Sequence, residues 1–261
     1  MNSLFDGTKQ MDDIEKIYNQ MEANCPNPCS TSKKLWELRR ACDISSHNVS
    51  SETLLEKAVA MLAARGHMPE WFNQCPVASG ITDSSMSRQD SKAVNKKSCV
   101  DLVHWDKANK FARLVELKWD SDDQPKWESN DPISALKQIL GYGATYIFCL
   151  VRKGQLNFPA TSLIKMNASH VSLEVVASRR FYNGYNEGGR FARISKDLNR
   201  FAGSKTGGTL TMSLKALAFP DGFQIPFADG GEVKQKCGAP SLTPEGKEIR
   251  SAFDNLTQVW P

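Results

Sequence analysis

The spacing of apolar residues predicts helices in the first quarter of the chain. Apolar side chains recur at helical intervals over 11–21, and a short second helix is expected over 34–42. A longer helix is expected over 51–65, followed by Gly66 as a C-terminal stop. Its apolar face comprises Leu55, Ala58, Val59 and Leu62. Residues 1–50 are therefore interpreted as a helical lead-in, and polar residues 82–98 as a surface loop.

The pattern then changes to the two-residue period of a β-strand. Strands are predicted over 99–105 and 111–119, and the turn over 106–109 makes them an antiparallel hairpin. After the acidic loop 120–131, helical spacing resumes over 132–143, with Asp131 as N-cap and Pro132 in the first turn. The wholly apolar run 145–151 is interpreted as a buried strand.

Beyond this run, a strand is predicted over 171–182, a helix over 191–201 and a strand over 209–218. The order of helices and strands predicts an α/β fold with a mixed sheet flanked by helices. Additions are expected at both ends of the core.

Composition narrows the class of protein further. The chain has 261 residues, of which 40% are hydrophobic and 24% charged, as in ordinary globular proteins. No apolar run approaches the roughly 20 residues of a membrane-spanning helix, so no membrane partner is expected. The acidic N-terminus lacks the apolar region of a secretory signal, and the seven scattered cysteines fit free thiols. A cytoplasmic location is therefore expected.

Charge is distributed unevenly along the chain. The net charge of +4 combines a slight acidic excess in residues 1–150 with a basic excess in residues 151–261. The asymmetry is compatible with an anionic partner.

Candidate chemistry gathers on the predicted hairpin. Glu116 and Lys118 lie two residues apart in a strand, so their side chains point to the same face. Asp101 lies on the preceding strand and can converge with Glu116 across the hairpin. Two carboxylates at that separation repel each other, and a divalent cation such as Mg²⁺ relieves the repulsion. His104 lies on the opposite face and is expected to be structural.

The Asp101 and Glu116-Leu117-Lys118 pattern resembles the PD-(D/E)xK nuclease superfamily, which has a restriction-endonuclease-like fold. The resemblance covers residues 51–151, because a helix precedes the hairpin and Gln138-Ile139-Leu140-Gly141-Tyr142 matches the Gln-x-x-x-Tyr motif of the RecB-like branch. Val100 stands where many members have proline. The resemblance leaves residues 152–261 as either part of the same domain or a basic extension.

The resemblance implies a nuclease that depends on Mg²⁺, or on Mn²⁺, and hydrolyses DNA. Asp101, Glu116 and the Leu117 carbonyl would hold the metal, and Lys118 would position the attacking water. Gln138 and Tyr142 would steady the site or the substrate backbone.

A further metal ligand is expected from the helix before the hairpin. Glu56 is the candidate, with Glu52 competing one turn earlier. Alternatively, Glu56 serves a capping box that begins at Thr53.

Basic residues in the last third of the chain are the candidate DNA contacts. Arginine, lysine and aromatic residues alternate through 179–215, a mixture that suits phosphate contact and base stacking. The candidates are Arg179, Arg180, Arg190, Arg193, Lys196 and Arg200; an ordinary solvated basic face is the alternative. By analogy, the chain is interpreted as a restriction-type or defence endonuclease, with a homodimer left open. The alternative function is a catalytically inactive nucleic-acid-binding protein with the same fold.

Overall fold

The computed structural model describes residues 8–24, 35–42, 50–77, 99–119, 131–186, 188–224 and 243–260. The helices are α1 (Thr8–Asn24), α2 (Ser51–Ala64), α4 (Pro132–Val151), α5 (Gly188–Thr206) and α6 (Thr243–Asp254), with a 3₁₀ helix η2 (Arg179–Tyr182). The strands are β1 (Trp71–Pro76), β2 (Cys99–Asp106), β3 (Phe111–Lys118), β4 (His170–Ala177), β5 (Thr211–Ala218) and β6 (Thr257–Trp260). The expected loop 82–98 and all but the last residue of the loop 120–131 lie outside the described residues.

The strands form one mixed, six-stranded sheet in the order β1-β2-β3-β4-β5-β6. Strands β1, β2 and β3 are antiparallel neighbours, whereas β3, β4 and β5 run parallel. Helices α4 and α5 make the connections between the parallel strands, and β6 adds an antiparallel edge. The predicted α/β class with a mixed sheet is confirmed, and residues 152–261 contribute three strands to the same sheet as the hairpin.

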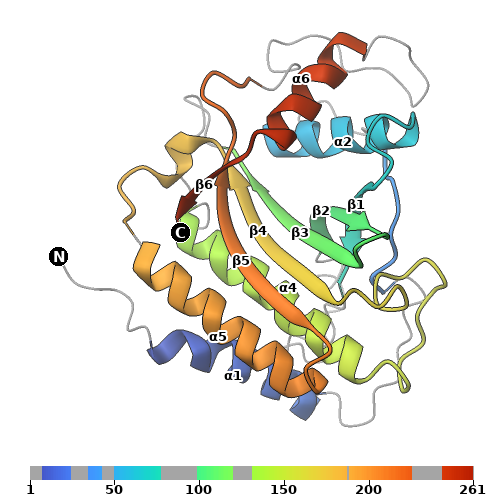
Figure 1. Ribbon diagram of the computed structural model, residues 1–261, viewed down its shortest axis with the longest axis vertical. Coiled ribbons are helices and arrows are strands. Elements are labelled where there is room, and N and C mark those ends of the chain that lie inside the picture. The colour runs from blue at the N-terminus through green and yellow to red at the C-terminus, as the bar shows by residue number, and fades with distance from the viewer. Residues whose placement is uncertain are drawn as a thin grey trace, which may run out of the picture.

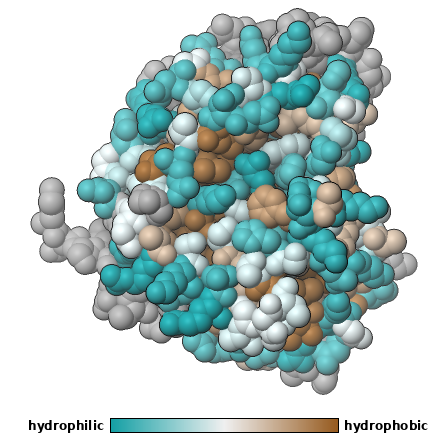
Figure 2. All heavy atoms as spheres, in the orientation of Figure 1, coloured by the Kyte–Doolittle hydropathy of each residue, from teal (hydrophilic) through white to brown (hydrophobic). Residues whose placement is uncertain are grey.

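Helices cover one face of the sheet along its length and the other face only near one end (Figure 1). Helices α1, α4 and α5 lie along one face, where alternate strand residues such as Leu114, Leu173 and Leu214 join one buried cluster. Helices α2 and α6 lie over the other face near the carboxyl ends of the parallel strands, where Leu117 and Val176 join a second cluster. Figure 2 shows apolar residues at the centre of the face that is turned to the viewer in Figure 1, with polar residues around them.

Local capping signals define the two helices that flank the hairpin. At the start of α2, the Ser50 hydroxyl accepts the Thr53 N–H, and Gly66 after the helix adopts a φ of 80°. At the start of α4, Asp131 accepts the N–H groups of the second and third helical residues, with Pro132 in the first turn. The predicted end of α2 and start of α4 are therefore confirmed.

The segment 145–151 is helical, so the prediction of a strand there was wrong. It forms the second half of α4, in which every residue from Ala144 to Cys149 is buried. The sheet lies on one side of α4, and α1 and α5 pack against its other sides, so this half has no polar face. A helix that is apolar all round has lost the periodicity that would distinguish it from a buried strand.

Three further differences concern shorter elements. Residues 35–42 form a turn and an extended segment instead of a helix, with Trp36 at a φ of 55°. The strand predicted over 171–182 ends at Ala177, and η2 follows it. Strands β1 and β6 and helix α6 were not predicted. In the described part of the chain, no helix is both long and apolar enough to cross a membrane.

Candidate functional site

The hairpin of β2 and β3 brings Asp101 and Glu116 together. The strands pair with Val103 opposite Leu114 and Leu102 opposite Val115, so the next step of this register sets Asp101 opposite Glu116. Residues directly opposite in an antiparallel pair share a face of the sheet. The Leu117 N–H also donates a hydrogen bond of 2.8 Å to Asp101 Oδ2, which fixes this carboxylate against the Glu116-Leu117-Lys118 segment. The two acids therefore lie near enough for the charge of Glu116 to act on Asp101, as the hairpin predicts.

Lys118 lies beside Glu116 on the same face, as the strand alternation predicted. Its Nζ donates to Glu116 Oε1 over 2.6 Å. The side chains of Glu116 and Lys118 are only 1% and 12% exposed, respectively, so the pair is largely removed from water. The other carboxylate oxygen, Glu116 Oε2, is buried and has no hydrogen-bond partner among the described residues. A buried carboxylate oxygen without a donor is costly unless a cation or water occupies its free side.

Helix α2 adds two more carboxylates at this end of the hairpin. Glu52 accepts the Trp119 N–H over 2.9 Å, directly after β3. Glu56, one turn later, is 7% exposed, and its Oε1 accepts a hydrogen bond of 2.7 Å from Asn73 Nδ2 on β1. Because α2 begins at Ser51, Glu56 lies in its second turn and does not cap the helix. Both glutamates named as competing candidates therefore approach the site.

Burial and mutual repulsion dominate the electrostatics of these acids. Burial raises the pKa of Asp101 well above its usual range, and repulsion by Glu116 and Glu56 adds to the effect. Burial likewise raises the pKa of Glu116 to about 7, although the Lys118 ammonium acts in the opposite direction. Burial also raises the pKa of Glu56. Such a cluster favours the binding of positive charge.

The cation already present in this cluster is Lys118. Burial alone would lower its pKa, but the Glu116 and Glu52 carboxylates outweigh burial and raise it. The ammonium is therefore a hydrogen-bond donor and a fixed positive charge in the site.

Gln138 and Tyr142 tie helix α4 to the strand that carries Asp101. Gln138 Nε2 donates to Tyr142 Oη over 2.8 Å, and Tyr142 Oη donates to the Cys99 carbonyl over 2.9 Å. Cys99 lies two residues before Asp101, so this chain of hydrogen bonds anchors the start of β2. Tyr142 is buried, whereas Gln138 reaches the surface. The two predicted residues thus share a helix face, and Tyr142 contacts the hairpin backbone while Gln138 is linked to it through Tyr142.

The donor set at the hairpin suits a hard divalent cation. Its side-chain ligands are carboxylate oxygens, and Glu116 Oε2 offers an unpartnered acceptor. In the described ranges, no three His, Cys, Asp or Glu side chains stand together as a metal-binding group. Mg²⁺ does not require one, since it is commonly held by one or two carboxylates and keeps several waters. The residues present therefore fit Mg²⁺ or Mn²⁺ held by Asp101 and Glu116.

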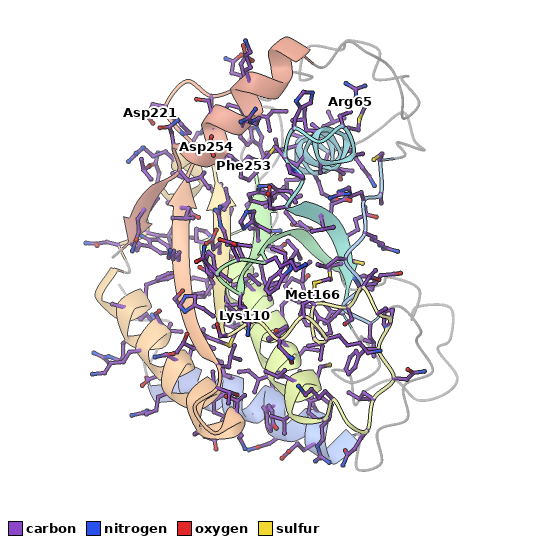
Figure 3. All side chains as sticks on the ribbon, turned by 45° about the vertical axis from the view of Figure 1, so that its right-hand side comes forward. Arg65, Lys110, Met166, Asp221, Phe253 and Asp254 are labelled. Carbon is purple, nitrogen blue, oxygen red and sulfur yellow. The ribbon has the colours of Figure 1, made fainter. Side chains whose placement is uncertain are left out.

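The six basic candidates divide between two places. Arg179 and Arg180 lie on η2, just after β4, whose Ala177 pairs with Lys118 of β3. They are therefore at the same edge of the sheet as Lys118. Arg179 Nε pairs with Asp221 Oδ1 at 3.0 Å, and Figure 3 shows Asp221 at this end of the molecule. The other four lie along α5, which runs away from this edge (Figure 1): Arg190, Arg193, Lys196 and Arg200.

His104 lies on the opposite face from Asp101, as expected. Its ring packs against Trp71 at 5.1 Å between centroids, with the two planes tilted by 56°, and it pairs across the hairpin with Arg113. Arg113 in turn forms an ion pair of 2.7 Å with buried Glu174 on β4. This structural pair was not predicted, because no pattern in the sequence connects residues 61 positions apart.

Two residues that contact the site were also not predicted. Asn73 and Gln74 lie on β1; Asn73 donates a hydrogen bond to Glu56, and the Gln74 amide acts on the pKa of Glu56 and lowers it. The signal available in the sequence was a pair of adjacent amides, Asn73-Gln74, inside a short apolar segment. Because β1 itself was not predicted, these amides were not assigned to the site.

Comparisons with known proteins leave the chain without an assigned relative. No protein-family model matches the sequence, and neither the curated proteins nor the solved structures gave a match.

Proposed function

We propose that this chain is a metal-dependent nuclease that hydrolyses DNA phosphodiester bonds, of the restriction or defence type. The observation that carries the proposal is the convergence of Asp101, Glu116 and Lys118 at the end of the hairpin, with Glu116 Oε2 buried and unpartnered. Two neighbouring carboxylates and a lysine at the end of a hairpin are the groups that such hydrolysis needs.

The order of elements supports the proposed resemblance to the PD-(D/E)xK superfamily. Helix α2 precedes the strands and directs Glu52 and Glu56 toward the site, and α4 with Gln138 and Tyr142 follows β3. A strand, β4, comes after α4 and pairs with β3 in parallel. The superfamily's expected succession of helix, hairpin, helix and strand is thus present, although its last strand begins at His170, beyond the predicted segment.

In the proposed reaction, Asp101 and Glu116 would hold Mg²⁺ or Mn²⁺, with the Leu117 carbonyl as the further ligand implied by the resemblance. The bound ion would stabilise negative charge on the phosphate and make water more acidic. Lys118 Nζ, charged at neutral pH, donates a hydrogen bond that orients the attacking water and offsets charge on the phosphate oxygens. The oxygen of the water would bond to phosphorus as the P–O bond to the sugar breaks. The attacking water would give one proton to solvent, and the departing sugar oxygen would take one proton from solvent.

A cleavage assay with matched variants tests the proposal. Supercoiled and linear DNA are incubated with the full chain and Mg²⁺ or Mn²⁺, alongside Asp101→Asn and Lys118→Ala. Asp106→Asn and Lys107→Ala serve as controls, because Asp106 ends the same strand as Asp101 and Lys107 lies in the exposed hairpin turn. We expect cleavage by the wild type and both controls, and a loss of at least 100-fold, roughly, in the two site variants.

The other outcomes separate the alternative functions. Binding of DNA by all variants with cleavage by none would favour a catalytically inactive nucleic-acid-binding protein. If the chain neither binds nor cleaves any DNA or RNA, both functions are excluded. Cleavage that survives unchanged in Asp101→Asn would contradict the assignment of the site.

A further inference from the structure

Strand β1 departs from regular extended geometry beside the site. Gln74 has a φ of 49°, in the left-handed region that non-glycine residues seldom adopt. Its neighbours pair normally, Asn73 with Leu102 and Cys75 with Val100, so the register sets Gln74 opposite Asp101. Arg39 Nε holds this conformation by donating to the Gln74 carbonyl over 2.8 Å. Left-handed non-glycine residues persist where the surroundings fix them, and they cluster at functional sites.

The left-handed residue has a direct effect on two side chains. Successive side chains of a regular strand point to opposite faces, so adjacent residues cannot normally reach one acceptor. Here Asn73 Nδ2 donates to Glu56 Oε1 over 2.7 Å, and the Gln74 amide is near enough to the same carboxylate to act on the pKa of Glu56 and lower it. The turn in the backbone at Gln74 explains how the two adjacent amides reach the same group.

Asn73 is itself fixed by a second set of contacts. It is fully buried, and its side chain makes two hydrogen bonds with the Ala41 backbone: Ala41 N–H donates to Oδ1 over 2.6 Å, and Nδ2 donates to the Ala41 carbonyl over 3.0 Å. Lys57 Nζ donates to the same carbonyl over 2.8 Å. The amide that contacts Glu56 is therefore rigidly held.

We propose that Gln74, together with Asn73, is a positioning residue that holds the Glu56 carboxylate near the Asp101–Glu116 pair, where its negative charge raises the affinity of that two-carboxylate site for a divalent cation. This inference rests on the proposed function, since it assumes that the hairpin carboxylates bind a metal. Hydrogen bonds that orient a carboxylate near a metal commonly affect metal affinity by about 10- to 100-fold.

The variant Gln74→Gly tests the inference without disturbing the core. Glycine adopts a positive φ without strain, so the fold should be retained, while the amide that contacts Glu56 is removed. Mn²⁺ binding by the full chain is measured by isothermal titration calorimetry for the wild type, Gln74→Gly, Glu56→Gln and the double variant. Asn167→Gly is the matched control, because Asn167 also has a positive φ (53°) but lies before the amino end of β4.

We expect Gln74→Gly to weaken Mn²⁺ binding about tenfold or more, with an unfolding temperature equal to or above that of the wild type. In the Glu56→Gln background, the same change should have no further effect, because Gln74 acts through Glu56. Asn167→Gly should bind Mn²⁺ like the wild type.

The contrary results are distinguishable. Wild-type affinity in Gln74→Gly, or an undiminished effect of Gln74→Gly in the Glu56→Gln background, would overturn the inference alone. If the wild-type chain does not bind Mn²⁺, the proposed function and the inference both fall.

Discussion

Asp101 and Glu116 differ in how the surrounding residues compensate their charge. Asp101 accepts the Leu117 N–H, whereas Glu116 contacts the Lys118 ammonium at 2.6 Å. Burial and repulsion raise the pKa of Asp101, so its ionised form costs stability that grows as the pH rises above about 3.9, the value of a free aspartate. Asp101 therefore lowers the stability of the metal-free protein.

The first prediction is that Asp101→Asn stabilises the metal-free chain. The asparagine Oδ1 can still accept the Leu117 N–H, while the buried negative charge is removed. At pH 8 we expect the free energy of unfolding to rise by about 1 kcal/mol, as measured by urea denaturation. The same variant should lose any increase in unfolding temperature that Mn²⁺ gives the wild type.

Glu116→Gln is the contrasting variant. It removes the charge that Lys118 contacts, leaving a largely buried ammonium without that partner, so no gain in stability is expected. Equal stabilisation by both substitutions would show that the Glu116–Lys118 pair adds nothing to stability.

His104 provides the second prediction, a dependence of stability on pH. Burial and then repulsion from Arg113 lower its pKa, outweighing the carboxylates of Glu70, Asp106 and Glu174. The unfolded chain therefore takes up a proton near pH 6.5 while the folded chain does not. The stability due to neutral His104 is complete above that pH, and it is lost as the pH falls toward the lower pKa of the folded state.

Urea denaturation at pH 7.5, 6.5 and 5.5 measures this effect. The contribution of one histidine cannot exceed about 1.4 kcal/mol per pH unit. His104→Gln should reduce the slope of stability against pH below 6.5. His170, whose pKa burial also lowers, and Glu116, whose raised pKa of about 7 acts on stability in the opposite direction over this range, contribute equally to the slopes of both chains. An unchanged slope in His104→Gln would contradict the prediction.

Gly143 lies where helix α4 packs most tightly against the sheet. A Cβ added at Gly143 would lie 2.6 Å from Leu173 Cδ1 on β4, closer than real contacts allow. Leu173 is fully buried, so it has little room to move. The absence of a side chain at Gly143 lets the helix approach the parallel strands closely.

The third prediction compares two glycines of this helix. Gly141→Ala should stabilise the protein by up to about 1 kcal/mol, because its Cβ would meet no atom within 4 Å and alanine favours a helix. Gly143→Ala gains the same propensity but incurs an overpacking cost of about 1–3 kcal/mol. We therefore expect Gly143→Ala to unfold at lower urea concentration than Gly141→Ala. The reverse order would exclude close packing as the role of Gly143.

The sequence was sufficient to predict elements with one buried face but not those buried on all sides or lying at an edge. Helix α5 shows the expected face, with Phe191, Ile194, Leu198 and Phe201 buried. The second half of α4 has no polar face to reveal its period, and it was mistaken for a strand. Strand β1 contains two amides and ends in Pro76, so its alternation is weak.

The site was predictable where its geometry depends on local strand alternation. Alternation along β3 placed Glu116 and Lys118 on one face, and the hairpin set Asp101 opposite. These relations are local, and a sequence expresses them directly. The positions of Asn73 and Gln74 beside Glu56 depend on how α2 packs against β1 and on the positive φ of Gln74. The spacing of apolar residues along the sequence predicts neither of these features.

At the scale of the molecule, the parallel strands β3, β4 and β5 all have their carboxyl ends at the same edge of the sheet. Lys118 and Ala177 pair at this edge, and Ala218 pairs with Ala177 on the other side. Helix α6 closes the same end: Phe253, shown in Figure 3, packs on Phe219 and Trp71 with centroid distances of 5.4 and 4.9 Å. The carboxylates and the arginines of η2 thus share one end of the sheet, although the net charge of +4 alone does not reveal this arrangement.

The fourth prediction follows from this arrangement and concerns DNA binding. If the backbone of DNA lies across the edge that carries Lys118, exposed Arg180 on η2 should contribute more to binding than exposed Lys196 on α5. Arg180→Glu and Lys196→Glu both change the net charge by two units, so the effect of net charge on DNA affinity is the same in both variants. Affinity for a DNA duplex is measured by fluorescence anisotropy over a series of salt concentrations, with Ca²⁺ in place of Mg²⁺.

We expect Arg180→Glu to weaken binding about tenfold and to reduce the slope of log K against log salt by about one, the signature of one lost phosphate contact. Lys196→Glu should weaken binding less and leave the slope nearly unchanged, because a distant charge acts only through a screened field. If the two variants weaken binding equally and change the slope alike, DNA contacts α5 as much as η2, and the edge of the sheet is not the preferred contact surface. A larger effect of Lys196→Glu would instead place the main contact surface along α5, and DNA would have to reach the catalytic groups from that side.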